Sequence, residues 1–573
     1  MKNFYGSDLI VNILRDYNIE YVSCNPGATF RGIQDSITNS KDRDTPELIL
    51  CCHEEISVAI AHGYAKASEK FMAVLLHSNV GLQHASMAIF NAWCDRVPML
   101  ILGGLGPLDS SKRRPWIDWI HTSNNQGGII RDYVKWDDQP YNIESTPESL
   151  HRACRITNTE PKAPVYVAID TTIQETQIKK DINTSSPNQY LPPTLAQADN
   201  NTLNKIAASL TNAKQPVIIV DRLGRSSKTI PSLLKLANTL SLPIIDCGGR
   251  YNFPNTHPLY ANGMESEILD KADVVLALDV NDLYHVLSQS KNKNSIDHIF
   301  HISMSDYLVS KWSADYQQLC PDVMTITAHT EVALPALIKK CEHIKDKINR
   351  NESPPPYLLR EKNKKLRQEW KTAAIHPVKN TRMPIPTVIN EIWQAIRNED
   401  WILTNYGSLQ VYEWIRRLWT LDKAGCHIGG SGGAGLGYGL GASIGAALFH
   451  KKEGKLCINV QTDGDFLFTP SALWTVSHYK LPLLIIMINN QSYKNTKEHS
   501  IEVANHRNRP TNTANIGSSL TCPTVNFPLL AQSFDIFSLD SVHKPNQIVP
   551  AIQKAIRYIK KHNRAALVDI LTE

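Results

Sequence analysis

The sequence predicts an α/β protein built from three doubly wound domains, each with its own parallel sheet. Three observations predict this fold class. Apolar strand-like runs alternate with helical patterns along the whole chain, which favours βαβ units. Two polar, proline-containing stretches divide the alternation into three blocks. The length of 573 residues also corresponds to three or four domains of ordinary size.

The first block begins with an amphipathic helix that runs into a strand. We expect strands at residues 20–24, 48–52, 71–76, 99–103 and 165–169. The polar stretch at residues 184–200 is typical of a linker. We therefore expect the first domain to cover residues 1–183 and the second to cover residues 190–350.

The second block repeats the pattern. Its expected strands lie in the sequences PVIIVD, LPIIDC, DVVLALD and HIFHIS. A second linker follows, with Pro354-Pro355-Pro356 and then a charged helix through Trp370. The third domain is expected at residues 380–573. Its strands lie in DWILTNYG, KLCINVQTDGD, LPLLIIMINN and AALVDILT.

The composition excludes several classes of function. The net charge of +5 is small and the basic residues are dispersed, so nothing indicates binding to nucleic acid. No apolar run is long enough to cross a membrane. The N-terminus lacks the pattern of a signal peptide. The 11 cysteines are scattered without a CxxC pair, which favours free thiols in a reducing cytoplasm.

Polar residues end two apolar strands of the third block. Asp463-Gly464 follow the strand at residues 456–460, and Asn490 ends the strand at residues 483–488. The loops after two such strands lie at the same edge of a parallel sheet, where ligands bind. A carboxylate, an amide oxygen and a nearby carbonyl suit Mg²⁺, which usually completes its shell with phosphate. The stretch predicts a site for a diphosphate and a metal ion.

The same stretch resembles the thiamin diphosphate signature, Gly-Asp-Gly followed at a distance by Asn-Asn. Thr462 stands at the first glycine, and Asn490 lies 27 residues after Asp463. The replacement keeps both metal ligands and removes only a permissive backbone position. With three α/β blocks in this order, the whole chain resembles thiamin diphosphate enzymes of the acetolactate synthase and benzoylformate decarboxylase type. The resemblance implies a pyrimidine-binding first domain, a central domain and a diphosphate-binding third domain.

The start of a helix in the first block carries the next resemblance. Residues 51–68 resemble the family pattern His-Glu-x-x-Ala followed by Gly-Tyr-Ala. Aligned on His53, the activating glutamate is Glu54 and not Glu55. The resemblance implies that Glu54 binds N1′ of the aminopyrimidine and favours its imino tautomer, for which burial is an advantage. An ordinary helix N-terminus, where glutamate is also favoured, is the other interpretation.

The glycine-rich segment at residues 429–448 fits two unrelated patterns, a dinucleotide fingerprint and a nucleophile elbow. Both require a strong apolar strand immediately before, and residues 421–428 do not form one. The resemblance instead implies a loop that holds the aminopyrimidine, followed by a helix of small residues. The Ala434 carbonyl would accept the 4′-amino group, and Leu436 would support the bent cofactor.

The remaining cofactor contacts also follow from the resemblance. Gly407 and Ser408 would donate to the diphosphate at a strand-to-helix turn, although a plain turn is the other interpretation. The metal ligands would be Asp463, Asn490 and the Ser492 carbonyl. The remaining cofactor-binding residues of the same motif would be Gly464, Asp465 and Tyr493.

The substrate side is expected around the turn Cys24-Asn25-Pro26-Gly27, with Asn25, Gly27 and Ala28 as candidates. Ala28 stands where the decarboxylase branch often has serine. His77 matches a histidine of the benzoylformate decarboxylase branch, and as a proton carrier it is a catalytic candidate, with a structural histidine as the alternative.

His121 is a third catalytic candidate, and it lies where the synthase branch has Phe-Gln. That region matches a family segment that reaches the partner subunit's cofactor. Asn79 and Gln126 are weaker candidates.

The resemblance implies a decarboxylase or carboligase that acts on a 2-oxo acid through a C2-carbanion/enamine intermediate. The cofactors would be thiamin diphosphate and Mg²⁺. The alternative within the family is acetohydroxyacid synthesis with FAD in the central domain, but only a Gly and Ser after one strand suit a phosphate there. A non-catalytic or hydrolytic α/β protein is the alternative from another class. The family also implies a homodimer or homotetramer with active sites between subunits.

Overall fold

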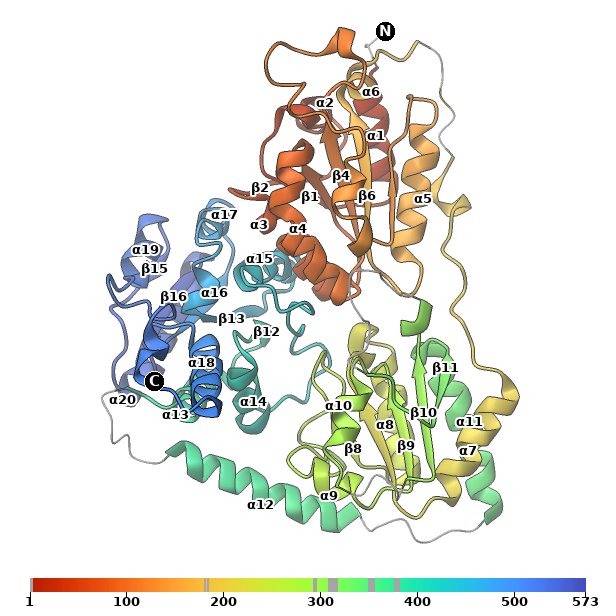
Figure 1. The fold of residues 1–573 in the computed structure, drawn as a ribbon, viewed down its shortest axis with the longest axis vertical. Helices are drawn as coiled ribbons and strands as arrows, with labels where there is room; N and C mark the ends of the chain where they lie inside the picture. Colours follow the sequence, from red (N-terminus) through yellow and green to blue (C-terminus); the bar gives the residue numbers. More distant parts are fainter. Residues whose placement is uncertain are drawn as a thin grey trace.

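The computed structural model describes residues 4–179, 182, 185–291, 296–307, 318–348, 356–375 and 382–573. It contains three separate parallel sheets with helices on their faces, which confirms the predicted fold class (Figure 1). The expected domain boundaries at residues 183, 350 and 380, and Pro354-Pro355, lie outside the described residues. None of the described helices has the length and apolar character to cross a bilayer.

The N-terminal block holds a six-stranded sheet in the order β2-β1-β3-β4-β6-β5. Its strands are β1 (Tyr21–Cys24), β2 (Glu47–Leu50), β3 (Ala73–Leu76), β4 (Met99–Leu105), β5 (Trp136–Asp138) and β6 (Pro164–Asp170). Its helices are α1 (Gly6–Asp16), α2 (Arg31–Thr38), α3 (Glu54–Ser68), α4 (Ser78–Cys94), α5 (Thr146–Asn158) and α6 (Thr171–Glu175). Strand β4 is buried along its whole length, as expected for a sheet covered on both faces.

The central block holds a five-stranded sheet in the order β11-β10-β9-β7-β8. Its strands are β7 (Pro216–Val220), β8 (Ile244–Asp246), β9 (Val274–Leu278), β10 (His298–Ser303) and β11 (Val323–Thr327). Its helices are α7 (Asn200–Asn212), α8 (Thr229–Leu240), α9 (Glu265–Leu269), α10 (Leu283–Ser288) and α11 (Thr330–Ile348). The long helix α12 (Pro356–Ile375) then runs from this block towards the C-terminal block (Figure 1).

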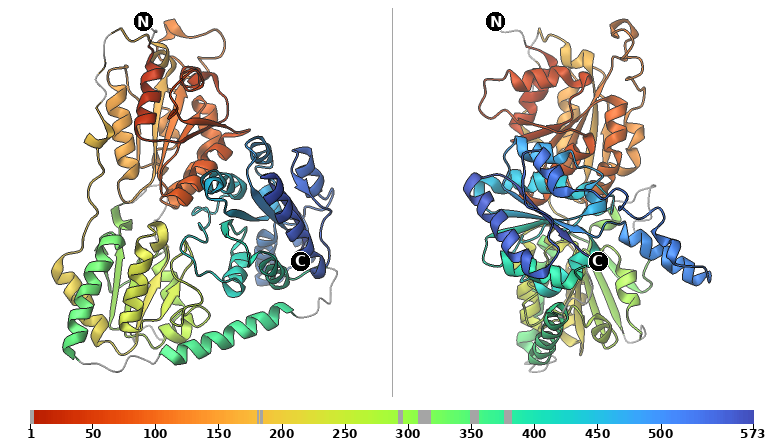
Figure 2. Two further views of the ribbon diagram at one scale, coloured as in Figure 1. Left: turned by 180° about the vertical axis from the view of Figure 1, so that it is seen from behind. Right: turned by 90° about the vertical axis from the view of Figure 1, so that its left-hand side faces the viewer.

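The C-terminal block holds a five-stranded sheet in the order β12-β13-β14-β16-β15. Its strands are β12 (Trp401–Asn405), β13 (Leu456–Thr462), β14 (Leu483–Asn489), β15 (Phe537–Ser538) and β16 (Ala566–Leu571). Its helices are α13 (Ile385–Ile396), α14 (Leu409–Leu418), α15 (Tyr438–His450), α16 (Asp463–Phe466), α17 (Ala472–His478), α18 (Lys494–His506), α19 (Phe527–Ser533) and α20 (Pro545–His562). Helix α18 has no buried residue and projects from the body of the molecule (Figure 2).

Helices α3 and α15 form the main contact between the N-terminal and C-terminal blocks (Figure 1). Both are buried on almost every side, and both carry glycine where their backbones meet. A Cβ at Gly63 would lie 1.9 Å from the Ala442 carbonyl oxygen, and one at Gly445 would lie 2.0 Å from that of Ile60. The small residues are therefore required for the two helices to approach this closely.

Candidate functional site

The predicted metal ligands meet at the carboxyl edge of the third sheet. β13 and β14 pair in parallel, so Asp463 and Asn490 leave adjacent strands at the same edge. The Ser492 N–H lies 3.3 Å from Asp463 Oδ2 and 2.9 Å from Asn490 Oδ1, which places both oxygens around one point. Burial raises the pKa of Asp463 to about 6, although backbone N–H groups oppose this shift. A divalent cation would offset the cost of the buried charge, so the donor set fits Mg²⁺.

The residues beside this set pack closely around it. The Tyr493 ring lies against Gly464, where a Cβ would come within 2.7 Å of the ring. Gly407 has a φ of +74° and lies against the end of β13. Ser408 caps α14, its hydroxyl oxygen accepting from the Val411 N–H at 3.3 Å. The N-terminus of this ten-residue helix is a suitable place for a phosphate.

The glycine-rich loop before α15 is held by side chains from α16 and α4. Asp465 Oδ1 accepts a hydrogen bond from the Gly437 N–H at 2.8 Å, so the Asp465 side chain contacts the loop. Asn91 of α4 brackets Gly435, donating to its carbonyl at 3.1 Å and accepting from its N–H at 3.0 Å. Ala434 adopts a φ of +55°, which an alanine rarely adopts without such support. Leu436 remains 39 % exposed and therefore available to a ligand.

Glu54 is buried at the start of α3, and both of its carboxylate oxygens are engaged. Asn25 donates to Oε1 at 3.0 Å, and His84 Nδ1 lies 3.2 Å from Oε2. Asn25, a substrate candidate from the sequence, thus contacts Glu54, whereas His84 was not singled out from the sequence. Glu55 has a different environment. It lies against Gly437, and burial beside Asp465 raises the pKa of Glu55 to about 7.

His77 and His121 form a second cluster next to Glu54. Their rings meet edge to face with centroids 4.8 Å apart. His77 Nδ1 bonds the Thr29 hydroxyl at 2.9 Å, and burial lowers the pKa of His77 to about 4. A Cβ at Gly27 would lie 2.4 Å from the His77 side chain, so glycine is needed in this turn. Within the described part of the chain, the buried His121 Nδ1 makes no hydrogen bond.

The remaining substrate candidates have simpler positions. Ala28 is exposed at the start of a short 3₁₀ turn. Asn79 donates to the Ile120 carbonyl at 3.3 Å and so ties α4 to the segment before His121. Gln126 is fully buried and donates to Gly104 and Tyr166. Its amide nitrogen therefore connects strands β4 and β6.

Asp95, which the sequence did not indicate, is the centre of a buried ionic cluster of five residues. Its carboxylate lies 2.7 Å from His62, 2.9 Å from Lys66, 2.9 Å from Arg250 and 3.9 Å from Arg222. Burial alone would raise the pKa of Asp95, but Arg250, Lys66 and the hydrogen bond from His62 hold it well below its usual range.

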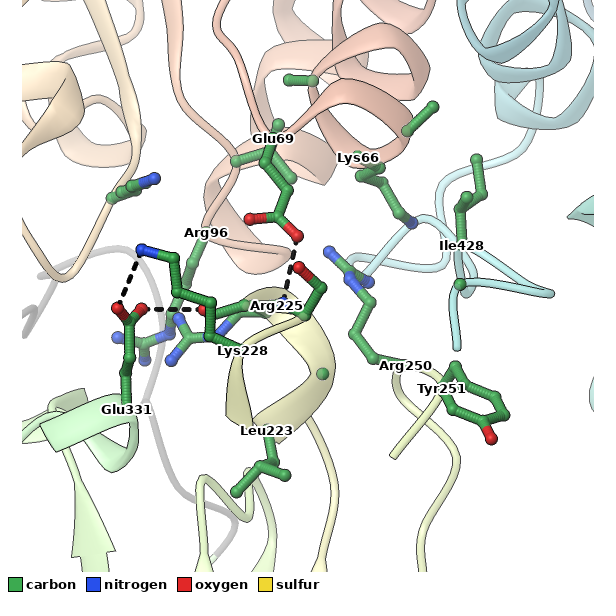
Figure 3. A pocket seen from close by; sticks show the side chains of 18 of the residues that line it. Lys66, Glu69, Arg96, Leu223, Arg225, Lys228, Arg250, Tyr251, Glu331 and Ile428 are labelled. Carbon is green, nitrogen blue, oxygen red and sulfur yellow. Dashed lines mark hydrogen bonds and ion pairs between the residues drawn. The ribbon is translucent and has the colours of Figure 1, made fainter. Parts of the chain in front are cut away.

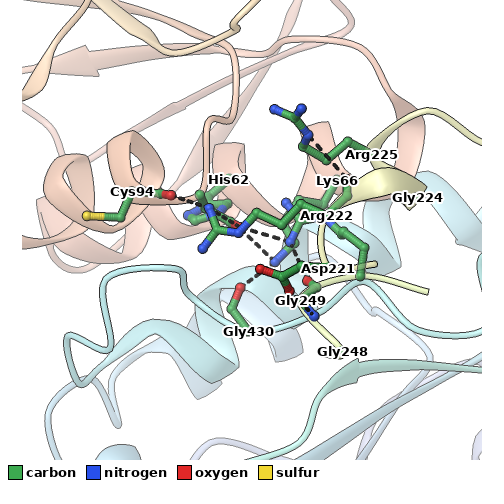
Figure 4. Close-up of polar contacts among 12 residues, drawn as sticks. His62, Lys66, Cys94, Asp221, Arg222, Gly224, Arg225, Gly248, Gly249 and Gly430 are labelled. Atoms are coloured by element: carbon green, nitrogen blue, oxygen red, sulfur yellow. Dashed lines mark hydrogen bonds and ion pairs between the residues drawn. The ribbon is translucent and has the colours of Figure 1, made fainter. Parts of the chain in front are cut away.

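The Asp95 cluster joins all three blocks. Lys66 also donates to the Gly430 carbonyl, and Arg222 of the central block donates to the Cys94 carbonyl (Figure 4). The cluster thus connects the central block to the base of the glycine-rich loop.

A cavity of about 590 Å³ lies where the three blocks meet, at the carboxyl edge of the central sheet (Figure 3). Its donors are largely used by acidic neighbours from this chain. The Ser227 N–H donates to Glu69 at 3.0 Å, and the Ser226 hydroxyl donates to Glu331 at 2.8 Å. Arg225 pairs with Asp279 at 3.3 Å. The Gly and Ser that suited a phosphate in the sequence therefore already have protein partners.

The fold and the site together define a class of protein. It is a three-sheet α/β protein with a set of oxygen donors at the carboxyl edge of its third sheet. Residues 4–128 match the N-terminal TPP-binding domain of thiamine pyrophosphate enzymes, residues 203–326 the central domain, and residues 406–570 the C-terminal TPP-binding domain. The chain belongs to this family of thiamin diphosphate enzymes.

Similar proteins fall in two branches of the family. The acetolactate synthase large subunit of Haemophilus influenzae is 24 % identical, over 100 % of this chain and 95 % of its own. The benzoylformate decarboxylase of Pseudomonas aeruginosa is 20 % identical, over 98 % of this chain and 97 % of its own. The structure of a 4-hydroxybenzoylformate decarboxylase from Rhodococcus jostii superimposes with a TM-score of 0.77 at 18 % identity. That match covers 100 % of this chain and 99 % of the other, and it concerns the fold alone.

Proposed function

We propose that this chain decarboxylates a 2-oxo acid, or joins the resulting fragment to a second carbonyl compound, with thiamin diphosphate and Mg²⁺ as cofactors. The observation that carries the proposal is the convergence of Asp463 and Asn490 around the Ser492 backbone. Thiamin diphosphate, when bound, supplies the electron sink for cleavage next to a carbonyl group. The chain supplies binding, orientation and proton transfer.

Each part of the site has a proposed role. Asp463, Asn490 and the Ser492 carbonyl hold Mg²⁺ against the diphosphate, with Gly464 and the N-terminus of α14 close by. Ala434 and Leu436 position the aminopyrimidine from the glycine-rich loop. Glu54 exchanges a proton with the ring nitrogen N1′, and its orientation is set by Asn25.

His77 and His121 lie on the substrate side of Glu54. Burial lowers the pKa of His77 to about 4, so its imidazole is neutral at pH 7. It therefore acts through hydrogen bonds and not as a cation. The unsatisfied His121 Nδ1 is available to a substrate group. Both imidazoles are placed to give or take a proton as the substrate carboxylate is lost.

We further propose that the functional unit is at least a homodimer. The family resemblance implies that Glu54 of one subunit lies against the metal site of another. Apolar side chains near the site support this, because a single chain leaves them uncovered. Trp116 is 75 % exposed and Trp119 63 %, just before His121, and Phe468 is 53 % exposed beside Gly437. Large exposed apolar residues close together in one segment, as Trp116 and Trp119 are, mark surfaces that bind a partner.

Calorimetric titration tests the cofactor site. Asp463→Ala should fold normally but lose at least about 10²-fold in affinity for thiamin diphosphate plus Mg²⁺, because a direct ligand is removed. Asp535→Ala is the matched control, since this exposed carboxylate pairs with Arg564 on the surface of the same block. Wild-type affinity in the Asp463 variant would refute the metal assignment.

The reaction itself is tested by a screen of 2-oxo acids for CO₂ release, with and without an aldehyde acceptor. The alternative is an acetohydroxyacid synthase with FAD in the central block. Its test is the release of flavin from the denatured protein, read by absorbance. The engaged donors at Ser226 and Ser227 argue against the flavin.

A further inference from the structure

Two imidazole side chains lie beside Glu54, and neither has a part in the proposed activation of the cofactor. His53 is the N-cap residue of α3, and His84 lies on α4. Their rings stack with centroids 4.9 Å apart and an interplanar angle of 20°. One ligand atom from each of His53, Glu54 and His84 lies within 4.8 Å of the others.

The chemistry of these three groups differs from that of the Asp463 set. Two imidazole nitrogens and one carboxylate oxygen are ligands that suit Zn²⁺ and its neighbours Ni²⁺ and Cu²⁺. Mg²⁺, in contrast, prefers oxygen alone. Three protein ligands with an open fourth position are also the usual composition of an accessible zinc site.

We propose that His53, Glu54 and His84 form a binding site for Zn²⁺ or a similar first-row divalent cation. In the single chain the ion would have access from solvent, because the His84 side chain is 60 % exposed. His84 Nδ1 and Glu54 Oε2 are 3.2 Å apart, close to the roughly 3.3 Å between two ligands of tetrahedral Zn²⁺ with bonds near 2 Å. His53 must move closer to complete the site.

One existing hydrogen bond must be given up when the ion binds. His53 Nδ1 accepts the Glu55 N–H at 3.2 Å. An ion on Nδ1 replaces that bond, and an ion on the other nitrogen leaves a proton on Nδ1, which then cannot accept. The bond is long, so its loss is a modest barrier to coordination.

The site has a consequence that rests on the proposed function. A cation on Glu54 removes the carboxylate that N1′ of the cofactor needs. Zn²⁺ and thiamin diphosphate should therefore bind in competition at Glu54, even though Mg²⁺ and the cofactor bind together. By linkage, each should weaken the other by the same factor. The site would make the enzyme sensitive to zinc and would not support its catalysis.

The experiment uses the full chain, freed of metal and cofactor, in an Asp463→Ala background that disables the magnesium ligands. Zn²⁺ is titrated by calorimetry, and Co²⁺ serves as a spectroscopic probe of nitrogen ligands in a four-coordinate site. We expect His53→Ala and His84→Ala each to weaken Zn²⁺ binding at least tenfold and to lower the visible Co²⁺ absorption. His478→Ala is the control, because that ring stacks on Trp474. His84→Gln gives a second variant that keeps the size of the side chain.

Binding that is unchanged in the His53 and His84 variants would overturn the proposal, as would binding of Mg²⁺ and Zn²⁺ with equal affinity. The readout does not depend on enzyme activity. If Zn²⁺ binds through the histidines but the wild type binds no thiamin diphosphate, the proposed function fails and the zinc site stands. If the cofactor binds and the variants bind Zn²⁺ like the wild type, the zinc site fails and the function stands.

Discussion

Glu54 is held at both oxygens, and this explains how one carboxylate is kept in a fixed orientation. The Asn25 amide, in a turn, donates to one oxygen, and the His84 ring, on α4, lies beside the other. Glu55, the next residue, points to Gly437 and is in a different environment. The two adjacent glutamates thus have different environments, so a variant of one can serve as the control for a variant of the other.

We predict that Glu54→Gln still binds thiamin diphosphate but slows hydrogen exchange at its C2 atom by at least about 10²–10⁴-fold, because the ionisable partner of N1′ is lost. Exchange of C2 hydrogen for deuterium, followed by NMR, measures this rate. Glu55→Gln should leave the rate within about tenfold of wild type, since it removes no N1′ contact. A normal rate in Glu54→Gln together with a slow rate in Glu55→Gln would shift the assignment by one residue.

A second prediction concerns pH and His77. Its pKa is about 4 in the folded chain because it is buried, against about 6.5 in an unfolded chain. Between these values the unfolded chain binds more protons, so the unfolding free energy falls as pH drops from 6.5 to 4. The groups that face His77 are Glu54, His121 and Arg114, and only Glu54 opposes this shift.

In His77→Asn, the unfolding free energy should depend less steeply on pH in that window. The difference in slope corresponds to up to about one bound proton. Thermal midpoints between pH 4 and 7 measure the slope. His562→Asn, on an exposed position at the end of α20, is the control. An unchanged slope in His77→Asn would show that this imidazole is not buried in its neutral form.

Site residues were predictable from the sequence where the motif is local. Asp463 and Asn490 are separated by one βαβ unit, so their spacing carries the information. The supports are different. Asn91 lies 344 residues from the Gly435 that it holds, and Asp95 lies 155 residues from Arg250. No spacing connects such pairs, because their contact depends on how the three blocks pack.

At the scale of elements, the long central strands were predictable, and so were the edge strands β2, β8 and β12, whereas the edge strands β5, β11 and β15 were not. β13 and β14 are continuous apolar runs buried on both faces, and such runs stand out in a sequence. β5 has three residues, β15 has two, and both lie at sheet edges. β11, also at an edge, has one buried residue among its five. Edge strands are only half covered, so their sequences are not constrained in the same way.

The contact between α3 and α15 gives a prediction at this scale. Gly63→Ala adds a methyl group 1.9 Å from the Ala442 carbonyl oxygen, and only a shift of one helix can relieve the clash. We expect a loss of about 1–3 kcal/mol in stability, despite the better helix propensity of alanine. Denaturant unfolding measures it.

The matched control is Gly32→Ala in α2, where the added Cβ meets only side-chain atoms at 3.0 Å or more. It should cost less than Gly63→Ala, because a side chain can move. Since α15 begins directly after the glycine-rich loop, Gly63→Ala should also weaken cofactor binding. Equal stability of the two variants would contradict the close helix contact.

At the scale of the whole molecule, the proposed dimer can be tested by complementation. Glu54→Gln and Asp463→Ala should each be inactive alone. After random subunit exchange, half of the dimers are hybrids, and each hybrid has one of its two sites intact. Activity should then return to about one quarter of wild type.

Activity in each separate variant is the baseline, and native mass spectrometry verifies that hybrids have formed. Hybrids without activity would place Glu54 and Asp463 of the same chain in one site. An active protein that sediments as a monomer would contradict the dimer directly.

The Asp95 cluster limits how freely the three blocks can be exchanged as modules. Its central carboxylate comes from the N-terminal block, two guanidinium groups come from the central block, and Lys66 bridges to the glycine-rich loop. Excising or exchanging the central block would leave Asp95 buried without its arginines. A chimaera in this family therefore needs a donor segment that brings an equivalent of Arg222 and Arg250, even when the transplanted domain has no ligand of its own.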